Sequence, residues 1–371
     1  MESPKKNRII YLDLMRAFAV LMMVQGHTVH TFLAPEFRTH DLFFYAAWDF
    51  MRGFTAPIFM FTAGVVFTYL LYYHKPSLHN NPRVIKGLKR FLLLVFIGYM
   101  LRYPSYIIWD FSTVTQQGWL VFFSVDALHL IGFGLLFIII SAFIAEKLKI
   151  KPYYIITAAL LFFFLTYPFV ASISWKDFLP LPIAAYFYSG TGSLFPLFPW
   201  AGYVLSGGVL GYYLSQNENA FKEKKFGIIL IVLGSCLFIT YFLMPKVLPI
   251  LGLSYTSDAF KMNTIVLRIG YVVGISGILS LAALRFDNIP DFIKLIGRHT
   301  LLIYAVHLVI LYGSAWVPSI YSTYGESLNV FQTLVAVAVM YILMGGMVIG
   351  LDKIQKFKKK KLAEIQAFTK P

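Results

Sequence analysis

The chain has 371 residues, of which 58% are hydrophobic, 18% are aromatic and only 13% are charged. Soluble domains carry charge on about a quarter of their residues, so this composition excludes an ordinary soluble domain. The net charge of +15 does not indicate nucleic acid binding, because the positive residues gather in short loops that alternate along the chain. The single cysteine, Cys236, excludes an intrachain disulfide and a thiol metal site.

Apolar stretches long enough to cross a bilayer recur along the whole chain. They predict an all-α, polytopic membrane protein of about ten transmembrane helices, forming a single domain over residues 1–371. The first stretch is too long and too polar for a cleavable signal peptide. The predicted spans are residues 10–32, 52–73, 90–109, 126–145, 153–171, 196–215, 226–244, 263–284, 294–313 and 330–351.

Positive charge predicts the orientation of these spans. Most of the 32 Lys and Arg residues lie in the N-terminus (Lys5, Lys6, Arg8), in the loops after even-numbered spans and in the tail 353–371. Such an excess marks the cytoplasmic side, so both termini are expected there. The KFKKKK run of the tail is interpreted as a topology anchor, with binding to anionic lipid headgroups as the alternative.

The first predicted span carries a stripe of ionisable residues. Arg16 and His27 are eleven positions apart and lie roughly 20° apart on one helical face, with Asp13 and His30 within about 100° of them. Ionisable groups at membrane depth are costly, face protein or water, and usually mark a functional site. The alternative is a helix fixed in its bundle by polar pairs.

Further ionisable residues are predicted in the outer half of other spans. Asp126 and His129 are three apart on one helical face, where a carboxylate orients an imidazole and raises its basicity. The others are Arg52, Arg102, Arg268 and His307. Alone, the last two arginines could snorkel or pair structurally, and His307 could be a packed core histidine. Together, these residues predict a shared, water-accessible site.

Glycine and proline patterns are interpreted structurally. Gly207 and Gly211, Gly270 and Gly274, and Gly346 and Gly350 have the GxxxG spacing that lets helices approach closely. Pro196 and Pro199 are expected to break the start of the sixth span.

Several stretches resemble known transmembrane acyltransferases. The run RIIYLDLMRAFAVLMMVQGH, with Arg16 and His27 separated by ten residues, resembles the first helix of the acyltransferase-3 family. The segment around Ala56, Pro57, Phe59, Phe61 and Gly64 is similar to the second helix of the heparan-α-glucosaminide N-acetyltransferase-like family. Later segments of that family are resembled by VDALHLIGFG, FPLFPWAGYVLSGGVLGYYL and IGRHTLLIYAVHLVILYG.

The resemblance implies a transferase that moves an acyl group, usually acetyl, from cytoplasmic acyl-CoA to a sugar amine or hydroxyl across the membrane. His27 would be the base or the transient acyl carrier, and Asp126 with His129 is predicted to share the catalysis. Substrate or acyl-CoA binding is predicted for Arg16, Asp13, His30, Arg52, Arg102, Arg268 and His307. No metal is expected, and His40 is a candidate for a second family histidine.

The resemblance has limits that shape the prediction of partners. The heparan-modifying relatives carry an extra span and a large lumenal domain, which favours a cell-envelope or exported glycan or glycolipid here and a bacterial cytoplasmic membrane. Membrane lipids and, by default, a homodimer are the other expected partners, with no nucleic acid.

Two other classes of function remain open. A proton-coupled small-molecule transporter also uses buried His, Asp and Arg residues. Against it, no inverted repeat is evident, and only the sixth span is expected to be broken. A structural or lipid-binding scaffold is the third interpretation.

Overall fold

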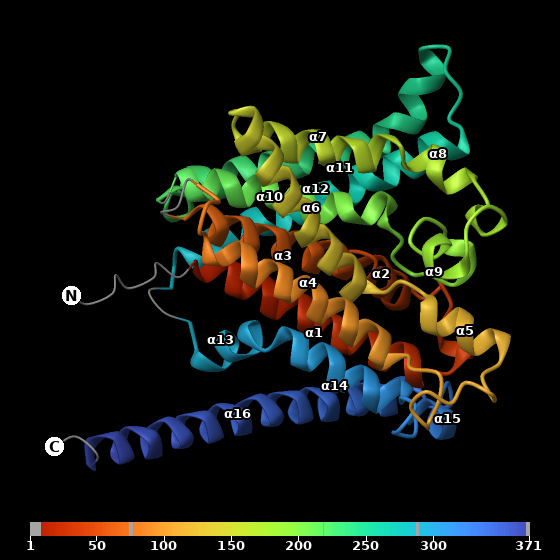
Figure 1. The fold of residues 1–371 in the computed structure, drawn as a ribbon. Helices are drawn as coiled ribbons and strands as arrows, with labels where there is room; N and C mark the ends of the chain where they lie inside the picture. The colour runs from red at the N-terminus through yellow and green to blue at the C-terminus, as the bar shows by residue number, and fades with distance from the viewer. Residues whose placement is uncertain (1–8, 74–76, 218, 287–288, 369–371) are drawn as a thin grey trace. The chain divides into compact units, whose positions relative to one another are not determined.

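The computed structural model describes residues 9–73, 77–217, 219–286 and 289–368. Within this part of the chain the regular structure is helical, apart from one isolated β-bridge, which confirms the all-α part of the predicted fold class (Figure 1). The longer helices are α1 (Ile10–Phe32), α3 (Thr55–Tyr72), α4 (Pro82–Leu101), α6 (Ala127–Leu148), α7 (Pro152–Leu165), α10 (Leu197–Gln216), α11 (Lys224–Ile250), α12 (Ser257–Ala283), α14 (Thr300–Tyr312) and α16 (Val330–Phe368). The shorter ones are α2 (Phe43–Arg52), α5 (Gln116–Phe123), α8 (Tyr167–Ser172), α9 (Leu181–Ala184), α13 (Asp291–Arg298) and α15 (Tyr321–Tyr324).

Each predicted span overlaps a helix of the structure. Some of these helices are long and apolar enough to cross a membrane by themselves. Among the described residues, six segments are long and apolar enough to cross a bilayer, and the bent pair α13–α14 would make a seventh. The chain is therefore an all-helical, polytopic membrane protein. Ten crossings and cytoplasmic termini stay predictions. Lys5, Lys6, Arg8, Lys75 and Lys370, which entered the orientation argument, lie outside the described residues.

The third span differs from its prediction. It was expected at residues 90–109, but α4 begins at Pro82 and ends at Leu101. Pro104 explains the early end, because a proline disfavours helical backbone in the residue before it and has no N–H to donate. Arg102 therefore follows the helix as its C-cap and does not lie within it.

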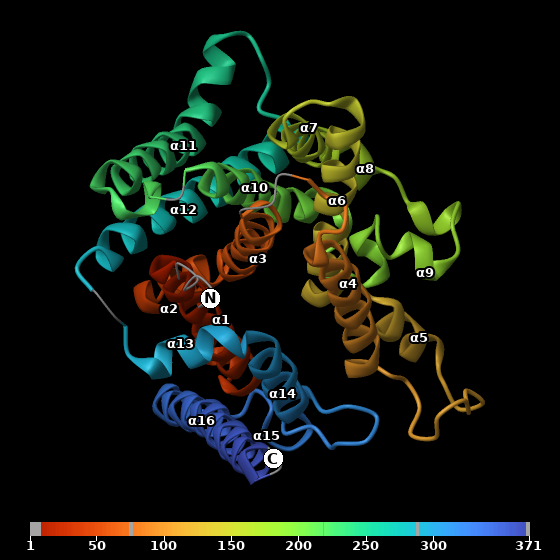
Figure 2. The same cartoon turned by 60° about the vertical axis from the view of Figure 1, so that its left-hand side comes forward.

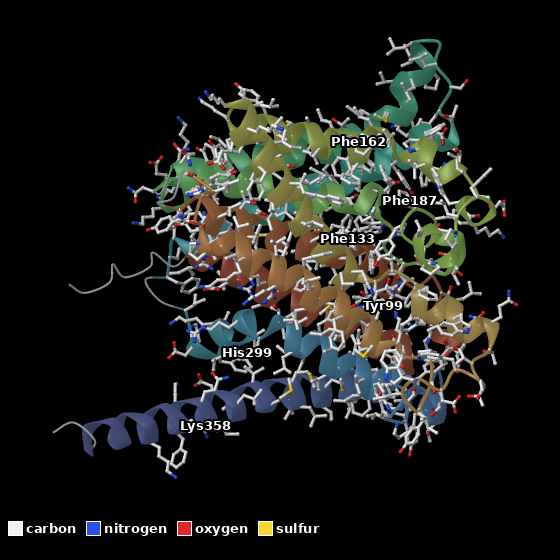
Figure 3. All side chains as sticks on the ribbon, viewed as in Figure 1. Tyr99, Phe133, Phe162, Phe187, His299 and Lys358 are labelled. Atoms are coloured by element: carbon white, nitrogen blue, oxygen red, sulfur yellow. The ribbon has the colours of Figure 1, made fainter. Side chains whose placement is uncertain are left out.

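Two spans are broken, where only one break was expected. Phe198 has non-helical backbone angles (φ −98°, ψ 124°) inside α10, which confirms the break predicted from Pro196 and Pro199. The second break lies at His299, labelled in Figure 3, where α13 and α14 meet at 73°. The expectation that only the sixth span is interrupted was wrong.

The helices form two compact units. The first comprises Met1–Met15, Phe54–Asp287 and Ser314–Trp316. In it, α3 packs along α10, α11 packs along α12, and α6 packs on α4, α7 and α10 (Figure 2). The second comprises Arg16–Gly53, Asn288–Gly313 and Val317–Pro371, and it contains most of α1 together with α14 and α16.

Glycines set the close approach of helices in the first unit. A Cβ added to Gly207 would lie 1.9 Å from the Phe61 carbonyl oxygen, and one added to Gly64 would lie 1.9 Å from that of Val204. The Gly207–Gly211 motif therefore works as predicted, at the α3–α10 contact. The Gly346–Gly350 motif does not, because a Cβ at either position meets nothing within 4 Å among the described residues.

This difference yields a stability prediction. Gly207→Ala places a methyl group against immovable backbone, so we expect it to lower the unfolding free energy by about 1–3 kcal/mol despite the better helix propensity of alanine. Gly346→Ala is the matched control and should cause no loss. Thermal unfolding of the purified proteins in detergent measures both, and equal midpoints would contradict the packing assigned to α3 and α10.

In the second unit, the C-terminal end of α1 is bound to the segment before α16. Leu33 and Leu328 form a parallel β-bridge, and the Ala34 N–H donates to the Leu328 carbonyl at 2.9 Å. The Arg38 guanidinium donates to the carbonyls of His30 and Leu33 and to Glu326 Oε1, the last at 3.1 Å. Arg38 thus satisfies carbonyls that the end of α1 leaves without intrahelical partners.

Arg38→Ala is therefore expected to lower the unfolding free energy by about 1–3 kcal/mol, since it leaves these acceptors unsatisfied. Arg38→Lys should recover only part of that loss, because one ammonium replaces a forked guanidinium. Lys261→Gln is the control, because its exposed ion pair with Asp258 joins residues three apart and contributes little. Chemical denaturation measures all three, and a loss in the control equal to that in Arg38→Ala would refute the assignment.

Candidate active site

Two imidazoles face each other within the second unit. His27 comes from α1 and His307 from α14, and their ring centroids lie 5.4 Å apart with the planes tilted by 46°. His27 is partly exposed, whereas the His307 side chain is fully buried. Both histidines lie in predicted spans, and the fold brings their rings into contact across 280 residues of chain.

A tyrosine holds the His27 ring. The Tyr312 hydroxyl lies 3.2 Å from His27 Nδ1, and the two rings meet edge to face. Tyr312 is the last residue of α14, so the helix that carries His307 also carries the partner of His27. A hydrogen bond at one ring nitrogen fixes the role of the other, which is the usual way a protein sets a catalytic imidazole.

The structure also defines the tautomer of His307. Its Nδ1 lies 2.6 Å from the Ile303 carbonyl oxygen. A carbonyl only accepts, so Nδ1 carries the proton and donates it, and Nε2 of the neutral ring carries a lone pair. That Nε2 is buried and makes no hydrogen bond within the described part of the chain.

Arg16 lies on α1 closer to the N-terminus of the helix than His27 does. Its guanidinium reaches the Thr300 hydroxyl at 3.5 Å, at the first residue of α14. Arg16 and His27 are separated by roughly 16 Å along the helix axis. Arg16 and His27 therefore contact the first and the last residue of α14, respectively.

Charged side chains surround the C-terminal end of α1. Arg52 pairs with Asp49 at 2.7 Å, and its guanidinium lies 5.4 Å from the Trp48 ring centroid. His40 contacts the same carboxylate at 3.3 Å. The aliphatic part of Arg52 rests beside Gly26, where an added Cβ would lie 3.4 Å from its Cγ. The exposed His30 lies in this region, with Arg38 donating to its carbonyl.

Asp126 and His129 lie in the first unit and act together at the start of α6. Asp126 Oδ1 accepts from His129 Nδ1 at 2.8 Å and from the backbone N–H groups of Leu128 and His129, so Asp126 caps the first turn of α6. The predicted contact is therefore present, and it has a local structural role. The catalytic role of the pair stays a prediction.

Aromatic side chains enclose this cap. The His129 ring meets Tyr99 at 4.4 Å between centroids, and the Tyr99 and Tyr186 hydroxyls are 2.9 Å apart. Burial, together with the hydrogen bond to Tyr99, raises the pKa of the Tyr186 hydroxyl, so Tyr186 stays neutral. Tyr99 and Phe133 mark this aromatic layer in Figure 3.

The two remaining arginines of the first unit are held in different ways. Arg102 donates to the carbonyl and hydroxyl of Ser124, two residues before Asp126. The Arg268 guanidinium lies over the Trp200 ring, 4.8 Å from its centroid. Among the described residues no carboxylate pairs with Arg268.

The structure thus divides the predicted residues into two sets. Arg16, His27, His30, Arg52 and His307 belong to the second unit, and Asp13, Arg102, Asp126, His129 and Arg268 belong to the first. A hollow shared by both sets stays a prediction. The sequence analysis missed Tyr312, Thr300 and the Arg38–Glu326 pair, because nothing local marks an ordinary tyrosine or threonine as the partner of a distant side chain.

The cap allows a direct test of the local role of Asp126. Asp126→Ala should lower the unfolding free energy by about 1 kcal/mol, whereas Asp126→Asn keeps an accepting oxygen and should stay close to the parent. Thermal unfolding in detergent compares the two variants. An equal loss in both would show that the negative charge, rather than the cap, stabilises this end of α6.

The structure defines an all-helical integral membrane protein with ionisable side chains paired among its apolar helices. The sequence model of an acyltransferase domain, that of the acyltransferase-3 family, matches residues 9–361. The chain therefore belongs to the acyltransferase-3 family, as its first helix predicted. Comparison with curated proteins and with solved structures gives no match.

Proposed function

We propose that this membrane acyltransferase takes an acyl group, most simply acetyl, from cytoplasmic acyl-CoA and delivers it to a carbohydrate amine or hydroxyl on the extracytoplasmic side. The observation that supports this proposal is the family membership combined with a tyrosine-held imidazole, His27, on an ionisable first helix. The acceptor must lose a proton as it attacks the thioester carbonyl. An imidazole titrates near neutral pH and is suited to take that proton.

His27→Ala is expected to fold normally and to lose transfer by about 10²–10⁴-fold, which is the usual contribution of a general base. The measurement is release of CoA thiol from acetyl-CoA by protein in nanodiscs, with glucosamine as an acceptor that offers both an amine and hydroxyls. His79→Ala removes an exposed loop histidine and is the matched control. Parental activity in His27→Ala would remove the assigned role.

Arg268 is proposed to bind an anionic group of the donor. A guanidinium at membrane depth without a carboxylate partner is costly, and its planar fork suits a phosphate of CoA while Trp200 covers one face. Arg102, the C-cap of α4, lies near Asp126 and is proposed to bind the same acyl-CoA donor. Asp13, Arg16, His30 and Arg52 are kept as proposed contacts along the substrate path.

Arg268→Gln should raise the KM for acetyl-CoA by about 10–100-fold, since hydrogen bonds to charged groups contribute about 1.5–3 kcal/mol. The KM for acetyl-pantetheine, which lacks the phosphates, should not change. Arg268→Lys keeps the charge but loses the fork and should fall between the two. An equal change in KM for both donors would show that Arg268 does not bind phosphate.

A proton-coupled transporter is the second candidate. The break at His299 favours it, because interrupted spans are typical of transporter binding sites and the structure contains two of them. Sealed vesicles separate the two functions. A transporter would move solute into the vesicles and release no CoA thiol, whereas the proposed enzyme would consume acetyl-CoA.

A further inference from the structure

His307 has a hydrogen-bonding pattern that packing alone does not explain. Its Nδ1 proton is committed to the Ile303 carbonyl at 2.6 Å, which leaves the Nε2 lone pair permanently available. That nitrogen is buried and has no hydrogen-bond partner among the residues that the structure describes. Leaving a buried polar atom unsatisfied is unfavourable, and each one in a native structure calls for a specific explanation.

The neighbours of His307 supply that explanation. The titratable rings around it are His27 of α1, at 5.4 Å between centroids, and Tyr304 of its own helix, at 5.9 Å. Tyr312, also on α14, contacts the His27 ring. A neutral imidazole with a fixed lone pair beside a second imidazole can share a proton with it, and the two then titrate as a unit.

We propose that His307 is the proton-holding partner of His27, through which it acts on the transfer reaction. This inference rests on the acyltransferase function proposed above. His307 is a positioning residue in this scheme, because it acts through its ring contact with His27. Its Nε2 lone pair favours the protonated state that His27 enters during the reaction.

The proton moves in a closed sequence. The acceptor oxygen or nitrogen bonds to the thioester carbonyl carbon while its N–H or O–H bond breaks and the proton joins the His27 ring. The carbon–sulfur bond then breaks, and its electron pair leaves with the CoA thiolate. Meanwhile the proton is shared between His27 and His307 Nε2. It finally returns through His27 to the sulfur, so both rings end neutral as they began.

The test uses two amide substitutions that mimic different ring nitrogens. His307→Gln places an amide near Nε2 that can accept a hydrogen bond but cannot take up a proton, and His307→Asn places one near Nδ1. Activity is thiol release from acetyl-CoA with glucosamine in nanodiscs. We expect His307→Gln to lower kcat by about 10²-fold with little change in KM, and His307→Asn to be no better.

The pH profile separates proton sharing from a purely structural role. In the parent, kcat/KM should follow two coupled ionisations that belong to the pair. In His307→Gln only one should remain, that of His27. Parental kcat with the parental profile would overturn the inference, and so would a lower kcat with an unchanged profile.

A measurement on the unaltered protein covers the case in which the variants fail to fold. In histidine-labelled protein, 15N NMR should show one ring protonated at Nδ1 and titrating together with a second ring, whereas independent titration would overturn the inference. The two proposals fail differently. An inactive His27→Ala beside a fully active His307→Gln removes only the role of His307, but a parent protein that consumes no acyl-CoA removes the enzyme itself.

Discussion

An ionisable side chain within an apolar helix must find a compensating partner, because the surrounding hydrocarbon offers none. This constraint organises the polar residues of both units. Tyr312 holds His27, Ser124 holds Arg102, and the Trp200 ring covers Arg268. Each of these partners lies within hydrogen-bonding or cation–π distance.

Against that background, the unsatisfied ring nitrogens of two histidines are informative. His129 Nε2 and His307 Nε2 are both buried without a hydrogen bond in the described part of the chain. The His129 ring is wedged against α4, since a Cβ at Gly98 would lie 2.4 Å from its Cε1, and it already serves in a helix cap. The His307 ring instead faces a second histidine. Packing and capping therefore account for the position of His129. For the lone pair of His307 we propose a role in proton transfer.

The same constraint shapes the backbone of this membrane protein. Close glycine contacts let α3 and α10 approach within van der Waals distance of each other's carbonyls, so helix–helix packing replaces the hydrophobic drive that lipid cannot supply. Where helices are interrupted, at Phe198 and at His299, the freed backbone groups need protein or water as partners. Arg38 shows the principle at the end of α1, where one guanidinium serves two carbonyls and a carboxylate.

The sequence by itself determined whatever depends on neighbours within a few turns of helix. The apolar segments, the face shared by Arg16 and His27, the Asp126–His129 contact and the proline break in α10 all follow from spacing along one segment. Family membership followed from the first helix in the same way. The tertiary structure alone decided which segments meet. It placed His307 and Tyr312 beside His27, bent the ninth span at His299, and left Gly346 without a packing partner among the described residues. Helical periodicity fixes the face on which a residue lies, but the partner of that face is set by packing between segments hundreds of residues apart.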